Sequence, residues 1–266
     1  MKSFFIILSF VLLIVPISLA HEEGNEAETN SAHKIHDNSL QNTLAGAAFL
    51  AILTIYILAV NKKKFFKKQK TILFILIVIP TILITFYLVY TTIYLNSISH
   101  TQGPIHWHAD YEIWNCNEQI ELINPQGFSN KIGSNIFHEH NDNRIHVEGV
   151  VINPLDVSLK EFFEVTGGTL TEKSLAINTP QGKKEINNNQ PCNNQPAALQ
   201  VFVWKTLAGK PSQEKIQNFP EYIISPYSNI PPGDCIIIEF SEEKSQTEKL
   251  CNTYKIAMEK GELIGS

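Results

Sequence analysis

The sequence predicts an α+β protein in two parts, an N-terminal membrane unit followed by a β-rich domain. Three observations predict this. The first 95 residues are dominated by three apolar runs, most of the remainder consists of short alternating segments, and a short helical pattern interrupts those segments. In the second part, hairpin, hairpin, helix, hairpin and closing strand follow one another. A β-grasp-like arrangement fits that order.

The first apolar run has the form of a secretory signal. A lysine precedes the run from Phe4 to Val15, and Ser18-Leu19-Ala20 places small residues at the positions that a signal peptidase reads. This favours a signal peptide over residues 1–20, and the alternative is an uncleaved first transmembrane helix. Residues 21–42 are polar and acidic, which is typical of a disordered arm.

Two further apolar segments, 43–60 and 71–95, are each long enough to cross a hydrocarbon core of about 30 Å. The loop between them, 61–70, contains six lysines. The positive-inside rule therefore predicts that this loop is cytoplasmic and that the following domain lies outside the cytoplasm. Neither segment contains Asp, Glu, Lys, Arg or His, so both are expected to be lipid-embedded anchors rather than parts of an ion pathway.

The rest of the chain divides into a domain over 101–241 and a C-terminal helix and tail over 242–266. From Ile105 to Ile113 apolar and polar residues alternate strictly, which predicts a half-buried strand. Ser158 opens a capping box before a short helix, Leu159–Val165. We expect helical structure also at Ser212–Asn218 and Lys244–Lys260. The net charge of −5 argues against a nucleic-acid partner, which needs a basic face.

Histidines are concentrated in the segment from His100 to Glu148, which contains six of the nine in the chain. Two His-x-His pairs and a His-x-Glu lie there on predicted strands, so the side chains of each motif project from one face. This density favours a transition-metal site, and the bland alternative is a solvated sheet face whose histidines make ordinary hydrogen bonds. The candidate ligands are His106, His108, His138, His140 and His146. Alternative ligands or supporting residues are Asp110, Asp142, Arg144 and Glu148.

Nitrogen-rich ligand sets suit several divalent metals, and outside the cytoplasm we expect copper or zinc. The chain has four cysteines, and disulfides persist on that side of the membrane. They allow three pairings, among which the sequence does not choose. The disulfide candidates are Cys116, Cys192, Cys235 and Cys251.

The order of these motifs resembles a group of uncharacterised archaeal and bacterial membrane-anchored proteins. The resemblance runs through His138-Glu-His140-Asn141, Ile145-His-Val-Glu148, the helix at Leu159 and the strand Gly233–Phe240. It covers roughly 105–240. In that group an Asp stands where this chain has Asn141, which puts a carboxylate ligand at that position in doubt. The resemblance implies a shared site without assigning an activity.

Three functions follow from these observations. The first is a membrane-anchored, extracytoplasmic protein that holds or passes on copper or zinc. The second is a metalloenzyme with an open coordination position and Glu139 or Glu148 as general base. The third is a non-metal envelope module that binds another protein through its sheet and whose histidines are incidental or pH-sensing. Imidazoles that meet at one point favour the first two, and imidazoles more than about 8 Å apart favour the third.

Overall fold

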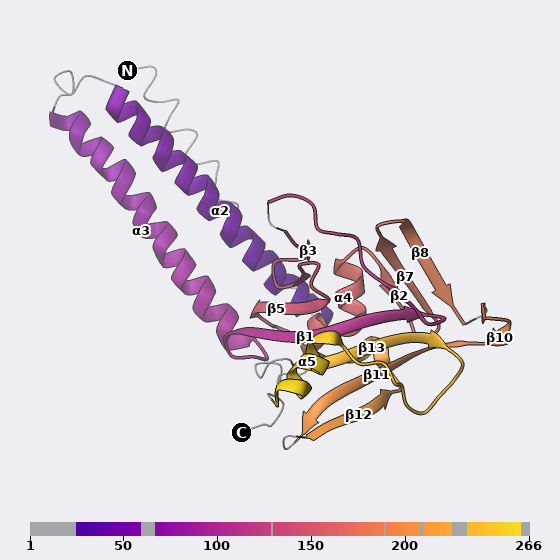
Figure 1. Ribbon diagram of the computed structural model, residues 1–266. Coiled ribbons are helices and arrows are strands. Elements are labelled where there is room, and N and C mark those ends of the chain that lie inside the picture. The colour runs from indigo at the N-terminus through magenta and orange to yellow at the C-terminus, as the bar shows by residue number, and fades with distance from the viewer. Residues whose placement is uncertain are drawn as a thin grey trace. The chain divides into compact units, whose positions relative to one another are not determined.

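The computed structural model describes residues 25–59, 67–128, 130–188, 190–207, 210–224 and 233–261. The expected signal peptide, 1–20, and residues 61–66 of the lysine-rich loop lie outside this range. The chain forms two compact units, Met1–Ile98 and Ser99–Ser266, and each is described by itself (Figure 1).

The first unit contains two long helices, α2 (Asn25–Ala59) and α3 (Lys67–Ile98). The segments Asn38–Ala59 and Lys67–Ile98 are long and apolar enough to cross a membrane. The two helices pack against each other at Gly46, where a Cβ would overlap the Ile84 side chain. By length and composition, the described part of this unit meets the requirements of a two-helix anchor.

The arm expected to be disordered is helical from Asn25 onward, because α2 runs without a break into the apolar segment. Nucleation is the costly step of helix formation, so a helix already formed by the apolar segment extends cheaply. The arm also contains Glu, Ala, Lys and Gln, which are good helix formers. Low hydrophobicity alone was therefore an insufficient reason to expect disorder.

The second unit is built on a mixed, 8-stranded sheet in the order β12-β11-β13-β1-β5-β4-β3, with β2 paired to β1. A three-stranded sheet (β6-β7-β8), a two-stranded sheet (β9-β10) and two α-helices complete this α+β domain (Figure 1). The strands of the main sheet are β1 (Pro104–Asn115), β2 (Glu118–Ile120), β3 (Ile132–Gly133), β4 (Phe137–Glu139), β5 (Arg144–Val150), β11 (Ala198–Leu207), β12 (Lys210–Ile216) and β13 (Asp234–Ser241). The other elements are η2 (Pro154–Val157), α4 (Leu159–Val165), β6 (Thr169–Leu170), β7 (Ser174–Thr179), β8 (Gly182–Asn187), β9 (Pro191–Cys192), β10 (Gln195–Pro196), η3 (Phe219–Glu221) and α5 (Asn252–Lys260).

Strand β1 lies at the centre of the main sheet. It pairs parallel with β13 on one side and antiparallel with β5 on the other. The predicted alternation is present, since Trp107, Ala109, Tyr111 and Ile113 all enter the main hydrophobic core. Helix α4 packs on this face, with Phe162 beside both Tyr111 and Phe137. The face of β1 that carries the candidate ligands is therefore the face away from the main core.

That second face is covered over part of its area by α5. A smaller core joins Phe202 of β11 and Ile237 of β13 to Tyr254 and Ala257 of the helix. The cover reaches β1, where Glu112 accepts a hydrogen bond from the Asn252 backbone N–H at 3.2 Å. The sheet thus has one face packed on the main core and one that α5 covers only in part.

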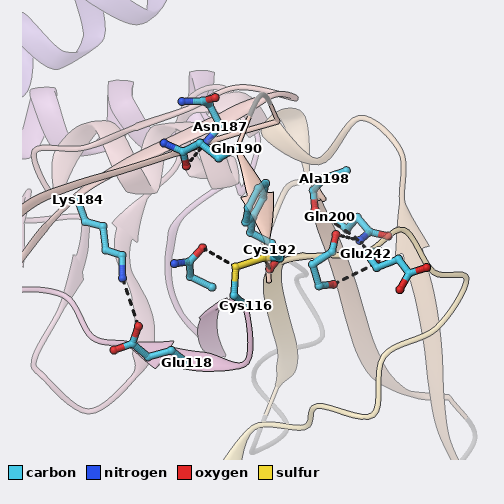
Figure 2. The surroundings of a disulfide bond; sticks show 12 residues. Cys116, Glu118, Lys184, Asn187, Gln190, Cys192, Ala198, Gln200 and Glu242 are labelled. Carbon is cyan, nitrogen blue, oxygen red and sulfur yellow. Dashed lines mark hydrogen bonds and ion pairs between the residues drawn. A yellow bond between two sulfur atoms is a disulfide. The ribbon is translucent and has the colours of Figure 1, made fainter. Parts of the chain in front are cut away.

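All four candidate cysteines form disulfides, and the structure selects one of the three possible pairings. Cys116 bonds to Cys192 and Cys235 bonds to Cys251. The first joins the turn after β1 to β9, beside the Glu118–Lys184 ion pair (Figure 2). The second joins β13 to the residue that precedes α5. Closing loops of 76 and 16 residues stabilises the fold by about 4 and about 3 kcal/mol respectively.

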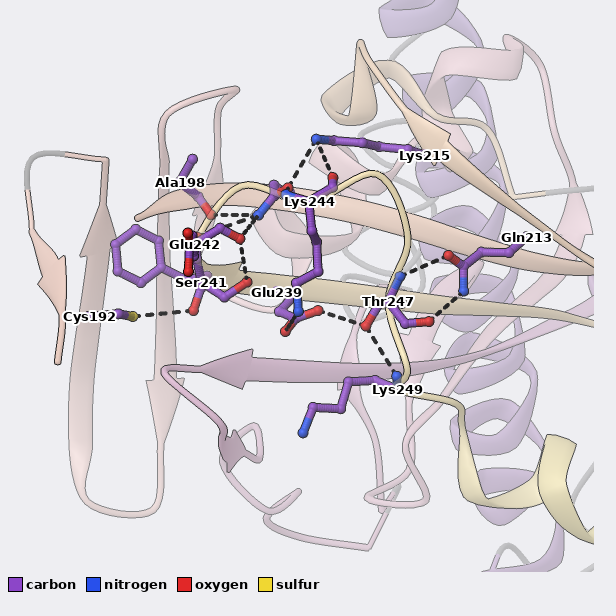
Figure 3. Close-up of polar contacts among 12 residues, drawn as sticks. Cys192, Ala198, Gln213, Lys215, Glu239, Ser241, Glu242, Lys244, Thr247 and Lys249 are labelled. Atoms are coloured by element: carbon purple, nitrogen blue, oxygen red, sulfur yellow. Dashed lines mark hydrogen bonds and ion pairs between the residues drawn. The ribbon is translucent and has the colours of Figure 1, made fainter. Parts of the chain in front are cut away.

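The expected helix over Lys244–Lys260 is wrong in its first half, because α5 begins only at Asn252. The fully buried Glu239 explains this. Lys244 donates to it at 2.6 Å and Thr247 at 2.7 Å, while Gln213 exchanges two hydrogen bonds with the Thr247 backbone (Figure 3). A buried carboxylate needs such partners, and Lys244 and Thr247 reach it from a segment without regular secondary structure between β13 and α5.

The expected helical turn at Ser212–Asn218 is also wrong. This segment forms most of β12, which pairs antiparallel with β11 from Lys210 to Ile216. Pairing with the buried strand β11 outweighs the weak local preference for helix. Because β12 is the edge strand of the sheet, Pro211 is tolerated there.

Candidate metal centre

Two adjacent strands build the centre of the site. In the β1–β5 register, Asp110 lies opposite Arg144, His108 opposite His146, and His106 opposite Glu148. Strand β4 adds a third position, since His138 lies opposite His146 on its other side. Side chains directly opposite each other on one face of a sheet are in contact. His108, His146 and His138 therefore form a row across three strands.

The first group of imidazoles, which we call the first triad, consists of His106, His108 and His146. One ring nitrogen from each lies within 4.8 Å of the others. The ring centroids of His106 and His108 are 4.4 Å apart, and those of His108 and His146 are 4.8 Å apart. In the described part of the chain, the ligand atoms of these three histidines already lie close enough together to hold a metal ion.

The other two candidate ligands lie against the same row. His138 is almost fully buried, and its ring centroid is 4.8 Å from His140 and 5.6 Å from His146. His140 in turn is 4.9 Å from His146. All five predicted ligand histidines are thus in one contiguous cluster. His100, in the turn before β1, makes none of these ring contacts in the described chain.

Glu148 lies between the two groups of histidines. Its Oε1 is 3.0 Å from Nε2 of His106, and its Oε2 is 4.0 Å from Nε2 of His138. A carboxylate that accepts from one ring nitrogen fixes the tautomer and leaves the other nitrogen as a lone-pair donor. Glu148 is therefore placed either to orient His106 or to bind a metal ion itself.

Asp110 and Arg144 support the site from the side of α5. Arg144 Nε donates to Asp110 Oδ1 at 2.7 Å, and the Thr253 hydroxyl of α5 donates to Asp110 Oδ2. Asp110 is almost fully buried, and burial raises its pKa, against the lowering effect of Arg144 and Thr253. Both oxygens are engaged, so Asp110 fixes β1 to β5 and α5 rather than facing the metal position.

Asp142 and the turn that contains it hold β4 and β5 together. Asp142 Oδ2 lies 3.3 Å from Nε2 of His146, and its Oδ1 accepts the Arg144 backbone N–H. Burial alone would raise the pKa of Asp142, but its interactions with His146 and Arg144 lower it. Asn141 has a φ of 66°, in the left-handed region that Asn adopts more readily than most residues. The turn geometry thus accounts for an Asn at this position.

Two of the five imidazoles, His108 and His138, are held in the neutral form that binds metals. Burial, together with the neighbouring His146 and His106, lowers the pKa of His108 to about 4. Burial and the nearby Lys131 lower the pKa of His138 to about 4. Both rings are therefore neutral at pH 7. A metal ion that binds them has no proton to displace, which favours binding at neutral pH.

Glu139, expected as one of two candidate general bases, lies on the other face of β4. It pairs with Ile145, and its Oε1 accepts the backbone N–H groups of Asp142 and Asn143 at 2.8 and 3.3 Å. Burial raises its pKa, against the lowering effect of these hydrogen bonds. Glu139 therefore stabilises the turn, and Glu148 is the carboxylate that faces the histidines.

Two supporting contacts were not anticipated from the sequence. Asn130 O lies 2.5 Å from Nδ1 of His140, and Thr253 reaches Asp110 across 143 residues. A carbonyl oxygen only accepts, so Nδ1 of His140 donates and its Nε2 carries the lone pair. Neither Asn130 nor Thr253 is part of a local motif, and only the tertiary fold brings them to the site.

The arrangement can hold a divalent transition metal with three imidazole ligands and one further position. A cavity of about 460 Å³ lies elsewhere, lined by β2 and the turn between β7 and β8. None of the protein-family models, curated proteins or solved structures compared with this chain matches it.

Proposed function

We propose that this protein is anchored in the cell membrane and binds copper or zinc through its histidine cluster, outside the cytoplasm, for metal handling. The observation that carries the proposal is the first triad, in which one nitrogen each of His106, His108 and His146 lies within 4.8 Å of the others. Imidazole ligands at this spacing need only small movements to reach the metal–nitrogen distance of about 2.0–2.1 Å.

The membrane and compartment are inferred from the first unit and the cysteines. Two helices have the length and composition to cross a membrane, and the lysine-rich loop between them favours the cytoplasm. The two disulfides suit an oxidising compartment. We also propose that residues 1–20 are a signal peptide, which would likewise place the second unit outside the cytoplasm.

We further propose that the domain is β-grasp-like and shares its site with the uncharacterised membrane-anchored group that its motifs resemble. The first and last strands of the main sheet, β1 and β13, are its central parallel pair. The hairpin partner β5 flanks β1, the hairpin β11–β12 flanks β13, and α4 lies between the hairpins in sequence. This is the order that a β-grasp arrangement requires.

The test is a metal titration of the full chain in detergent. Native protein should bind one equivalent of Zn²⁺ or Cu²⁺ tightly. The variant His146→Ala should weaken binding by about 100-fold or more, because loss of a supporting residue alone costs 10–100-fold. The matched control is His100→Ala, a histidine of the same domain outside the cluster, which should bind as native protein does. Native protein that binds no ion, or His146→Ala binding that equals native, would contradict the proposal.

A metalloenzyme is the second candidate, on one observation. Glu148 is 45 % exposed and lies beside the first triad, where it can serve as a general base to a water molecule at the fourth position. Hydrolysis of an activated ester by the zinc-loaded protein, abolished in Glu148→Gln with the metal still bound, would support this candidate. Equal hydrolysis by native protein and Glu148→Gln would rule out that role.

A further inference from the structure

The first triad uses only three of the five clustered histidines. An ion bound by His106, His108 and His146 leaves His138 and His140 without a metal, although both contact His146 through their rings. Within the described chain, Nδ1 of His138 and Nδ1 of His146 are buried and have no hydrogen-bond partner. A buried polar atom without a partner is costly, and a metal ion is one group that would satisfy it.

The remaining two histidines form a second triangle with His146. The three centroid separations are 4.8 Å for His138–His140, 5.6 Å for His138–His146 and 4.9 Å for His140–His146. Two imidazoles that bind one tetrahedral ion through bonds of about 2.0–2.1 Å have ring centroids about 5 Å apart. All three separations lie close to this value.

We propose that His138, His140 and His146 form a second metal position, which shares His146 with the first. This proposal rests on the proposed function. An ion in either position keeps His146 as a ligand, so it can change position by exchanging only the other two imidazoles. The protein would then have two alternative binding positions for one ion on neighbouring strands, as a metal-transfer role requires.

Two contacts prepare the second position. Asn130 O accepts from Nδ1 of His140, so the lone pair of that ring is on Nε2. Glu148 Oε2 is 4.0 Å from Nε2 of His138, so a small movement would let it accept a hydrogen bond from Nε2 and leave Nδ1 to bind the ion. The planes of the His138 and His146 rings are within 4° of parallel, so one ring must turn about χ2 to direct its lone pair at a shared ion. That torsion has broad, shallow preferences in histidine.

The test uses two double variants of the full chain in detergent, titrated with Zn²⁺ and with Co²⁺ as a spectroscopic probe. His106→Ala/His108→Ala removes the first position and leaves the second intact. His138→Ala/His140→Ala does the reverse. We expect each double variant to bind one equivalent, with different Co²⁺ absorption spectra, and the triple variant His106→Ala/His108→Ala/His146→Ala to lose tight binding.

The outcomes separate this inference from the proposed function. If native protein and His138→Ala/His140→Ala bind an ion but His106→Ala/His108→Ala does not, the second position is absent and the proposed function stands. The same holds if native protein binds but neither double variant does, because one site would then use both pairs. If native protein binds no ion, both proposals fail.

His138 is buried. If the Ala variant does not fold, His138→Gln/His140→Gln replaces it. The decisive variant changes only His106 and His108, which are on the open part of the sheet. Near-ultraviolet circular dichroism of each variant confirms the native fold before titration. A folded His106→Gln/His108→Gln variant that binds no ion overturns the second position as clearly as the Ala version does.

Discussion

The two ends of one face of β1 differ in how their polar side chains are satisfied. At the end covered by α5, Asp110 and Glu112 are buried, and both accept hydrogen bonds from the helix. At the open end, the side chain of His106 is 61 % exposed and contacts Glu148. The same strand therefore carries a structural polar site where it is covered and the candidate metal ligands where it is open.

The largest expected change in the free energy of unfolding comes from removing Asp110 at the end of β1 that α5 covers. Asp110→Ala leaves Arg144 and Thr253 without their shared partner, and removing one member of a buried pair costs about 3–5 kcal/mol. Chemical denaturation should show a loss near the lower limit, since Arg144 is 26 % exposed. The matched control, Glu118→Ala, breaks the exposed ion pair with Lys184 and should cost under about 1 kcal/mol. Equal losses in the two variants would contradict the assignment.

The second prediction concerns the Cys235–Cys251 disulfide, which holds α5 on the sheet, and asks whether metal binding depends on it. Replacing Cys235 and Cys251 together by Ala should lower the free energy of unfolding by about 3 kcal/mol, because a 16-residue loop is no longer closed. Metal affinity should change by less than about 10-fold, since the histidines lie outside the area that α5 covers. Loss of metal binding in a variant that remains folded would contradict this prediction, because the histidines at the open end of β1 would then depend on the end covered by α5.

A pH titration of stability tests the open end in the metal-free protein. The pKa values of His108 and His138 are about 4 in the folded chain, against 6.5 in the unfolded chain. As the pH falls from 6.5 towards 4, the unfolded chain takes up protons first, so stability present above pH 6.5 is progressively lost. Thermal midpoints measured with a chelator should therefore decrease over this range, and less so in His138→Gln. A constant or rising midpoint contradicts the prediction.

The smallest effect is expected from Glu148→Gln. This change keeps the shape of the side chain but weakens its hydrogen bond with His106, and loss of such a supporting carboxylate lowers metal affinity by about 10-fold. The control is Glu185→Gln, which alters an exposed ion pair with Lys183 in the other sheet. Competition titrations with a zinc indicator measure both. An unchanged affinity in Glu148→Gln would remove Glu148 from the site.

The α+β class and the face of β1 that carries the ligands could be predicted, because strict alternation from Ile105 to Ile113 determines which side chains share a face. The grouping of ligands could not. It depends on the register that places His108 and His138 on either side of His146, and register is a property of strand pairing. The five histidines could be named as candidates, but not divided into groups.

The errors have a common physical cause. Residues 212–218 and 244–251 have polar patterns compatible with helix, yet β11 and the buried Glu239 determine their conformation. Thr253 illustrates the same limit, because its bond to Asp110 joins residues far apart in sequence. Tertiary partners outweigh local preference where backbone or carboxylate groups would otherwise be buried without hydrogen bonds.

The most direct test of the central claim is the zinc K-edge X-ray absorption spectrum of the full chain loaded with one equivalent of zinc. The account predicts about three imidazole nitrogen ligands at about 2.0–2.1 Å, with the multiple-scattering signature of histidine, and their reduction in His146→Ala. A spectrum with only oxygen ligands, or one unchanged in His146→Ala, would contradict it.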